Sequence, residues 1–274
     1  MEALLPTLRS VDASSIDDPA SAAGIICPPR AINAFSSACI LNALLGIPTI
    51  AASALDAGVA MASRDQGLWL EFGAASGSST KRIARHHHVH SFDSFEGLPE
   101  QWREPPEGGH KNLTKMASDW LSKGSFNRSG IPPHLRRAES RNITWAIGWF
   151  DRTLPPFLAR HADRNVSFVS IDCDLYSSAS TVLRLLAPRL SPGAILVFDE
   201  LINYPEFEAG EMKALLELQR DTGRSLRVLG TPSRRVALTE AAARAVIRRF
   251  GTVYGEQSNR SEHGFLQQAL VQIV

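Results

Sequence analysis

From residue 67 onward, short apolar segments alternate with stretches of helical character, and this alternation restricts the fold more than any other feature of the sequence. Two of the segments, 166–171 (VSFVSI) and 194–198 (AILVF), are nearly continuous runs of apolar residues. Such runs are typical of strands buried on both faces, as in a parallel sheet covered by helices on each side. The sequence therefore predicts an α/β fold with a mostly parallel sheet.

The same patterns predict the order of elements and two insertions. The expected strands are 68–72, 89–93, 142–148, 166–172, 194–198, 226–229 and 266–274, and the expected helices are 79–88, 178–190 and 207–220. The 48 residues between Asp93 and Asn142 exceed what one βα unit needs, so we expect a lid insertion at about 100–141. A smaller insertion is expected at about 233–262.

The N-terminal part differs in character, and we expect two units along the chain. Residues 1–30 are rich in Ser, Ala, Asp and Pro and are expected to form a loop or arm. Residues 31–63 are expected to form two cap helices that meet near Pro48, because proline ends one helix or starts the next. We therefore divide the chain into residues 1–63 and a sheet domain at 64–274.

Composition and charge exclude several classes of protein. The chain has 29 basic and 28 acidic side chains, and a formal net charge of +1 gives no electrostatic reason to bind nucleic acid or an anionic membrane. Pro48 and Asp56 interrupt the most apolar stretch, 38–62, which favours buried helices over a membrane span. A disulfide framework is not expected, because the cysteines are three, widely spaced and without a CxxC pair: Cys27, Cys39 and Cys173. With no signal peptide expected at the start, we predict a cytoplasmic protein.

A glycine turn follows the first expected strand, and an acidic residue follows the second. The turn at Gly73–Gly77 allows a ligand to approach the backbone, although it is neither a GxGxxG fingerprint nor a P-loop. Asp93 lies 20 residues after Gly73, where an acid can accept both hydroxyls of a ribose. Together the turn and the acid predict an adenosine-containing ligand. The alternatives are a tight turn without a ligand and a helix cap at Asp93.

Four acidic residues follow two neighbouring strands, Asp172 and Asp174 after one and Asp199 and Glu200 after the other. Carboxylates within reach of one site repel one another, and a hard cation such as Mg²⁺ relieves that repulsion. The alternative is that two of these residues cap helices or pair with arginine.

Five segments of the chain resemble a known enzyme family. LEFGAASGSST, VHSFDSFEGLPEQW, ITWAIGWFDRTLPPFL, VSFVSIDCDLYSSASTVL and GAILVFDELINYP are similar to the TylF/macrocin O-methyltransferase-type family of class I S-adenosylmethionine (SAM)-dependent methyltransferases. The resemblance runs from about Leu68 to Lys213 and returns in the last strand. It implies a Rossmann-like, seven-stranded sheet in which only the last strand is antiparallel, with helices on both faces.

The resemblance also implies roles for individual residues. The Gly73–Ser78 turn would hold the methionine part of SAM, Asp93 the ribose, and residues 148–150 would lie near the adenine. Asp174 would be the general base, and Mg²⁺ would be bound by Asp172, Asp199 and Glu200. The predicted cofactor-binding residues are Glu71, Gly73, Ala75, Ser76, Gly77, Ser78, Asp93, Ser94, Gly148, Trp149, Phe150 and Asp172.

Two departures from the family leave the acceptor and the metal open. Ala75 stands where many methyltransferases have glycine, and the pair Asp199-Glu200 stands where the sugar methyltransferases carry two aspartates. The expected substrate is a small molecule with a hydroxyl group, on a sugar or another natural product, and a phenol or amine stays open. A homo-oligomer such as a dimer is compatible with the family.

Two other functions remain as alternatives. A nucleotide-sugar glycosyltransferase could bind its metal through Asp172-x-Asp174, and a non-catalytic methyltransferase-like domain could act on a protein partner.

Overall fold

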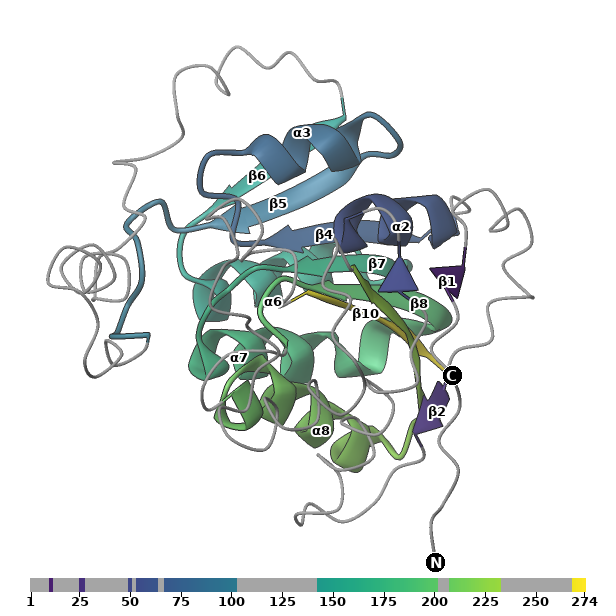
Figure 1. Cartoon of the computed structure of the whole chain (residues 1–274). Coiled ribbons are helices and arrows are strands. Elements are labelled where there is room, and N and C mark those ends of the chain that lie inside the picture. Colours follow the sequence, from purple (N-terminus) through teal and green to yellow (C-terminus); the bar gives the residue numbers. More distant parts are fainter. Residues whose placement is uncertain are drawn as a thin grey trace, which may run out of the picture.

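The computed structural model describes residues 53–63, 67–102, 142–201, 207–232 and 268–274, with the backbone of three short strands at 10–11, 25–27 and 49–50. At its centre is a sheet (Figure 1). Seven of its strands are β4 (Leu68–Phe72), β5 (Val89–Asp93), β6 (Ile143–Ile147), β7 (Val166–Ile171), β8 (Leu190–Phe198), β9 (Leu226–Pro232) and β10 (Ala269–Ile273).

The order of these strands across the sheet is β6-β5-β4-β7-β8-β10-β9. β4 pairs in parallel with both β5 and β7, and β7 pairs in parallel with β8. β10 is antiparallel to both of its neighbours, β8 and β9. The seven-stranded Rossmann-like sheet with an antiparallel last strand is therefore confirmed. The order reverses between β4 and β7, and ligands of such sheets bind beyond the carboxyl ends of the strands at that point.

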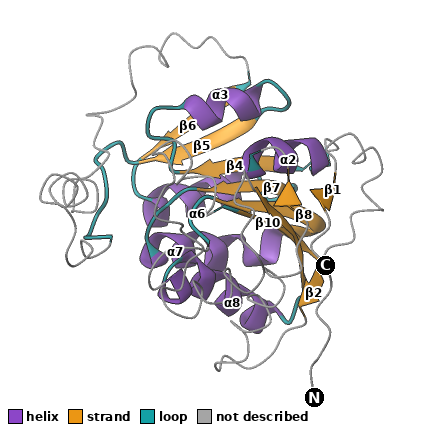
Figure 2. Cartoon of the chain, in the orientation of Figure 1, coloured by secondary structure: helices purple, strands orange, loops and turns teal. Residues whose placement is uncertain are grey.

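Helices cover both faces of the sheet (Figures 1 and 2). α2 (Ala54–Met61) and α3 (Ser78–Ala84) lie on one face, and their apolar residues form a cluster with Trp69, Phe168 and Val197 of the strands. α6 (Phe150–Arg160), α7 (Tyr176–Leu186) and α8 (Glu211–Thr222) lie on the other face. Two 3-10 turns, η2 (Ala187–Arg189) and η3 (Phe207–Ala209), precede β8 and α8.

The residues of β4 illustrate why the central strands are mostly apolar. Leu68, Leu70 and Phe72 belong to the core on the α6–α8 side, whereas Trp69 belongs to the core on the α2–α3 side. All four side chains are buried. Because successive side chains of a strand point to opposite faces, a strand in the middle of a sandwiched sheet presents apolar residues to both helical layers.

The sequence pattern locates most elements but does not indicate α6. This helix contains Pro155 and Pro156, which lack the N–H that an inner helical position donates and therefore hide the helical pattern. Its Leu154 and Phe157 are buried, so packing against the sheet stabilises it. Boundaries also differ: α3 ends at Ala84 instead of residue 88, and β8 begins at Leu190 instead of residue 194.

The N-terminal part contributes strands as well as a helix. β2 (Ile25–Cys27) pairs with β9, and β1 (Ser10–Val11) pairs with β3 (Thr49–Ile50), which continues the sheet from β9. The expectation of a loop over 1–30 and of helices alone over 31–63 is therefore wrong at these positions. Hydrogen bonding to the open edge of β9, which local sequence does not reveal, is the reason. α2 falls within the second expected cap helix.

The two expected insertions lie mainly outside the described residues: residues 103–141 of the first and 233–262 of the second have no description. Within the described ranges, none of the helices has the length and apolar character needed to cross a bilayer.

The stability of the folded chain depends on pH through the buried side chain of His90. Its ring, on β5, contacts Phe157 and His161, and burial together with neighbouring positive charge lowers its pKa from 6.5 to about 4. Below pH 6.5 the unfolded chain binds a proton at His90, whereas the folded chain binds it only near pH 4. The free energy of unfolding therefore has its full value above pH 6.5 and decreases as the pH falls toward 4, by up to about 1.4 kcal/mol per pH unit.

We expect His90→Phe to reduce this slope between pH 6.5 and pH 4, because Phe keeps the ring contacts and cannot be protonated. Urea unfolding of the wild type and the variant at several pH values measures the difference. His86→Gln, a change at an exposed position after α3, is the control and should keep the wild-type slope. Equal slopes in the wild type and His90→Phe would contradict the assignment.

Candidate active site

A cavity of about 710 Å³ lies at the carboxyl ends of β4, β5, β7 and β8, where the strand order reverses. The loops that follow these four strands form its walls, together with the start of α7 and the segment after β6. Its lining includes the predicted residues Gly73, Ala75, Asp93, Ser94, Trp149, Phe150, Asp172, Asp174, Asp199 and Glu200. The structure thus brings together ten predicted site residues that are distant in the sequence.

The glycine turn after β4 requires glycine at position 73. Gly73 has a φ of 91°, and a Cβ atom at this position would lie 1.7 Å from the carbonyl oxygen of Asp172. The backbones after β4 and β7 therefore touch at the floor of the cavity. Ala75 adopts a φ of 41°, which glycine adopts more easily. Gly77 is the N-cap of α3, so the turn leads directly to a helix N-terminus.

Asp93 connects this turn to the end of β5. Its Oδ2 accepts hydrogen bonds from the backbone N–H groups of Ala74 (2.9 Å) and Ala75 (2.8 Å). Its Oδ1 accepts one from the N–H of Phe95 (2.6 Å). A carboxylate has about four acceptor sites, so Asp93 can hold the turn and still accept from a ribose hydroxyl. The structure therefore gives Asp93 an additional role, positioning the turn.

Glu71 does not line the cavity, although we expected it to contact the cofactor. Its side chain is fully buried, and Oε2 accepts hydrogen bonds from the hydroxyls of Thr80 (2.5 Å) and Ser91 (2.6 Å). Burial raises the pKa of this carboxyl. Glu71 therefore holds α3 against β5 beneath the turn. Four other predicted cofactor residues are also absent from the described lining: Ser76, Gly77, Ser78 and Gly148.

The segment after β6 forms another wall. The N–H of Gly148 donates to the carbonyl oxygen of Asp93 (2.9 Å), which fixes this segment beside the end of β5. The ring of Phe150 contacts that of Phe72 edge to face, with centroids 5.4 Å apart. Trp149 is 36% exposed and lines the cavity, so it offers an apolar face to a flat ligand such as a purine.

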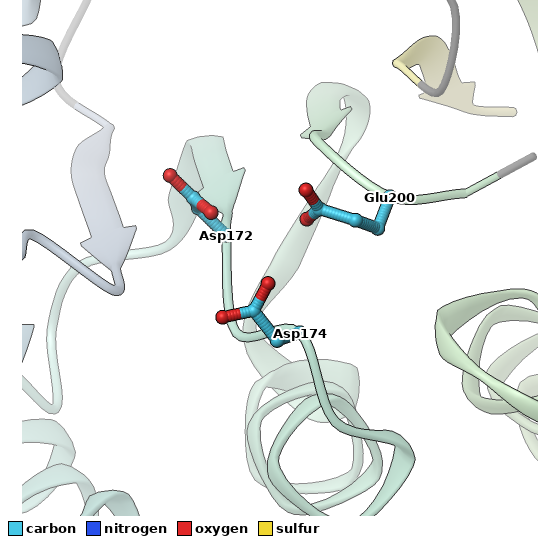
Figure 3. A group of neighbouring side chains, drawn as sticks. All are labelled: Asp172, Asp174 and Glu200. Atoms are coloured by element: carbon cyan, nitrogen blue, oxygen red, sulfur yellow. The ribbon is translucent and has the colours of Figure 1, made fainter. Parts of the chain in front are cut away.

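Three carboxylates converge at the ends of β7 and β8 (Figure 3). Oxygen atoms of Asp172, Asp174 and Glu200 all lie within 4.8 Å of one another, although no ion is present. Asp174 has a φ of 61°, a left-handed conformation that aspartate adopts more readily than most residues. Glu200 Oε2 is buried and has no hydrogen-bond partner in the described part of the chain. Three oxygen donors in this arrangement suit a hard divalent cation.

Asp199, the third ligand that we predicted, has a different environment. Its Oδ1 accepts a hydrogen bond from Nε2 of Gln268, and Oε1 of Gln268 accepts one from the N–H of Ala54 (3.3 Å). Asp199 is thus linked through Gln268, which precedes β10, to the start of α2. The group of three neighbouring carboxylates contains Asp174 and not Asp199, while Asp199 lines the same cavity and stays a predicted ligand.

Burial and mutual repulsion favour the neutral forms of these acids. The pKa values of Asp172 and Glu200 lie well above their usual range, first because of burial and then because of the neighbouring carboxylates. The pKa of Asp199 is also raised, mainly by burial. A bound cation would act in the opposite direction, since it stabilises the ionised forms.

Sequence reasoning missed Glu211, the first residue of α8. Its side chain is fully buried beside the acidic group, and its pKa is raised to about 8, first by burial and then by Asp174. In the sequence Glu211 lies within an amphipathic helix, where an acid is usually exposed. Sequence reasoning also missed the hydroxyl side chains of α7 that line the cavity, which are Ser177, Ser178 and Thr181. Their spacing is the signal, because residues four apart share one face of a helix.

Comparison with known proteins agrees with this architecture. Residues 70–201 match the family model described as a methyltransferase domain. A curated protein of Streptomyces olivaceus, 8-demethyl-8-(2,3-dimethoxy-alpha-L-rhamnosyl)-tetracenomycin-C 4'-O-methyltransferase, is 29% identical over 115 residues, which are 39% of this chain. The matched segment spans 40% of that protein's length.

Solved methyltransferases resemble the chain in structure. The calicheamicin methyltransferase CalS11 has a TM-score of 0.49 and 23% identity, over 67% of this chain and 74% of that one. The O-methyltransferase NovP has a TM-score of 0.37 and 24% identity, over 57% and 64% of the two chains.

The family match covers the strands and loops that build the cavity, from β4 to the end of β8. The strand order, the antiparallel last strand and the position of the cavity are those of class I enzymes. Residues 70–201 therefore match a methyltransferase domain, and the sheet that carries them has the class I methyltransferase fold.

Proposed function

We propose that this chain is a SAM-dependent O-methyltransferase that acts on a hydroxyl group of a small molecule. One observation carries the proposal: a single cavity is lined by the Gly73 turn, by Asp93 and by the acidic residues after β7 and β8. The first two suit an adenosine-containing cofactor, and the acids suit the activation of a hydroxyl group. The 4'-O-methyltransferase relative supports a sugar of a natural product as the acceptor.

In this proposal each wall of the cavity binds one part of the cofactor. The turn from Gly73 to Ala75 contacts the methionine part, Asp93 accepts from the ribose, and Trp149 lies against the adenine. The hydroxyls of α7 and the acidic residues are left for the acceptor. We propose residues 64–274 as the catalytic domain and residues 1–63 as an accessory part of the chain.

Methyl transfer to an alcohol requires alignment of the acceptor oxygen with the sulfonium methyl and removal of one proton. Asp174 is the proposed base, because it lies in the cavity beside Asp172 and Glu200. Mg²⁺ held by Asp172 and Glu200, with Asp174 nearby, would lower the pKa of the acceptor hydroxyl. The unpartnered Oε2 of Glu200 supports a cation there.

The test has two stages. Calorimetric titration of the purified full-length chain with S-adenosylhomocysteine (SAH), with and without Mg²⁺, is expected to show micromolar binding. Release of SAH from SAM is then measured with rhamnosylated aromatic compounds, free phenols and amines. Absence of SAH binding would refute the cofactor assignment and favour a nucleotide-sugar enzyme. Binding without turnover of any acceptor class would favour the non-catalytic alternative.

We expect Asp93→Asn to weaken SAH binding by about 10–100-fold, since one buried unsatisfied polar group costs about 1–3 kcal/mol. The two carboxylate oxygens of Asp93 accept hydrogen bonds from three backbone N–H groups. The side-chain amide of Asn has only one oxygen, so its NH₂ group would face at least one of these N–H donors. Calorimetry with SAH measures the change. Asp221→Asn, at the exposed end of α8, is the control. Unchanged affinity in Asp93→Asn would show that neither the ribose nor the turn depends on this carboxylate.

A further inference from the structure

Glu211 is a fully buried acid whose place in the fold is fixed by its helix. It is the first residue of α8, and the neighbouring Met212 and Leu215 are buried in the core against the sheet. α8 also packs along α7, the helix that follows the acidic loop after β7. A buried charged group needs compensating hydrogen bonds, so the partners of Glu211 indicate its role.

These partners lie in both of the loops that carry the acidic residues. Oε1 of Glu211 accepts a hydrogen bond from the backbone N–H of Cys173 (3.3 Å), which separates Asp172 from Asp174. The backbone of Glu200 lies beside the Glu211 carboxyl, whose Oε2 is buried and has no hydrogen-bond partner in the described part of the chain. One side chain from α8 therefore contacts the loop after β7 and the loop after β8.

Each loop needs such support, because neither has regular secondary structure at these residues. The loop after β7 holds Asp174 at a φ of 61°, a left-handed conformation that is unfavourable for residues other than glycine. Repulsion among the carboxylates of Asp172, Asp174 and Glu200 further tends to separate the loops. A bridging acceptor opposes both effects without itself lining the cavity.

From this geometry we infer that Glu211 is a positioning residue, which sets the spacing between the two acidic loops through its hydrogen bond to Cys173 and its position beside the backbone of Glu200. The inference rests on the proposed function, since it assigns Glu211 to the site where the acceptor and a cation would bind. It adds a residue that contacts neither the cofactor nor the acceptor. Its effect is exerted through the backbone on either side of Asp172, Asp174 and Glu200.

Three substitutions separate the reach of the hydrogen-bond acceptor from the carboxyl group itself. Glu211→Gln keeps an oxygen of the same reach and removes the carboxyl group. Glu211→Asp keeps the carboxyl group and shortens the side chain by one methylene, so that its oxygen falls short of the loops. Glu211→Ala removes both. Glu217→Ala is the matched control on the same helix, because Glu217 accepts from the hydroxyl of Tyr176 and contacts neither strand-end loop.

Hydrogen exchange of the full-length chain, detected by mass spectrometry, measures the amide exchange rates of the two loops directly. We expect exchange in peptides covering 172–175 and 199–201 to rise at least tenfold in Glu211→Ala and Glu211→Asp, and to stay within threefold of wild type in Glu211→Gln. Glu217→Ala should leave the 199–201 peptide unchanged. If Glu211→Ala does not fold, the exchange rates of Glu211→Asp and Glu211→Gln are compared instead, and their difference tests the inference.

Titrations with Mn²⁺ and with SAH add a readout of the site. We expect Glu211→Asp to weaken Mn²⁺ binding at least tenfold, with SAH affinity within threefold of wild type, and Glu211→Gln to keep both. Wild-type exchange at both loops in Glu211→Asp and Glu211→Ala would overturn the inference. So would Glu211→Gln behaving like Glu211→Asp. A wild-type chain that binds neither SAH nor Mn²⁺ would instead overturn the proposed function, and the exchange comparison would still decide the role of Glu211.

Discussion

Replacing Asp174 by Asn is expected to lower the rate of methyl transfer by about 10²–10⁴-fold, the contribution typical of a general base. Asn has nearly the same shape and is tolerated in the left-handed conformation that residue 174 adopts, so the loop should keep its structure. SAH affinity should remain within a few-fold of wild type. SAH release with an acceptor found in the screen, and calorimetry with SAH, measure the two quantities.

Asp151→Asn is the matched control for this substitution. Asp151 also lines the cavity, but its side chain is largely exposed and pairs with Arg152 at 3.3 Å. We expect it to change the rate less than threefold. A near-normal rate in Asp174→Asn would exclude Asp174 as the base. A lost rate together with weakened Mn²⁺ binding would make Asp174 a metal ligand, as its position beside Asp172 and Glu200 also allows.

Gly73→Ala is expected to abolish measurable SAH binding and to lower the Tm. The added Cβ would lie 1.7 Å from the carbonyl oxygen of Asp172, so the backbone after β4 or β7 must move. The φ of 91° is also unfavourable for alanine. A cost of about 3 kcal/mol, which is large for one substitution, corresponds to a Tm lower by about 6–12 °C. Thermal unfolding and SAH titration measure both effects.

Ala75→Gly is the opposite substitution two residues later and serves as the control. Ala75 has a φ of 41°, so glycine relieves local strain, while it costs about 0.5–1 kcal/mol in conformational entropy. We expect the two effects nearly to cancel and the Tm to stay within about 2–4 °C of wild type. A wild-type Tm and SAH affinity in Gly73→Ala would show that the contact between the turn and Asp172 is not needed.

The central strands could be predicted from the sequence because their burial leaves a strong local signal. β4, β5 and β7 have apolar residues facing both helical layers, and the predicted bounds match the observed ones to within one residue. α6 escaped prediction because Pro155 and Pro156 weaken the helical pattern, while contacts with the sheet stabilise the helix. β1, β2 and β3 escaped it because pairing with β9 or with one another, not composition, makes these residues strands.

Part of the candidate site could likewise be predicted from the sequence, and part could not. Gly73, Asp93 and the acids after β7 and β8 could be predicted, because each directly follows an apolar strand and the ends of parallel strands meet at one edge. The sequence predicted four acids at one site, but not that Asp174 lies in the close group with Asp172 and Glu200, nor the link from Asp199 to Gln268. Which oxygens converge depends on backbone conformation after each strand and on partners distant in the sequence.

The sequence by itself determined the class of fold, the order of the central strands along the chain and the residues delivered to the cavity, since these follow from local patterns of burial and turn formation. Only the tertiary structure decided which carboxylates form one group and which side chains hold them in place. Glu71 and Glu211 show the difference. In the sequence each is an acidic residue within a strand or a helix, with no sign that it is buried. The packing of α3 and α8 against the sheet buries both side chains beneath the site.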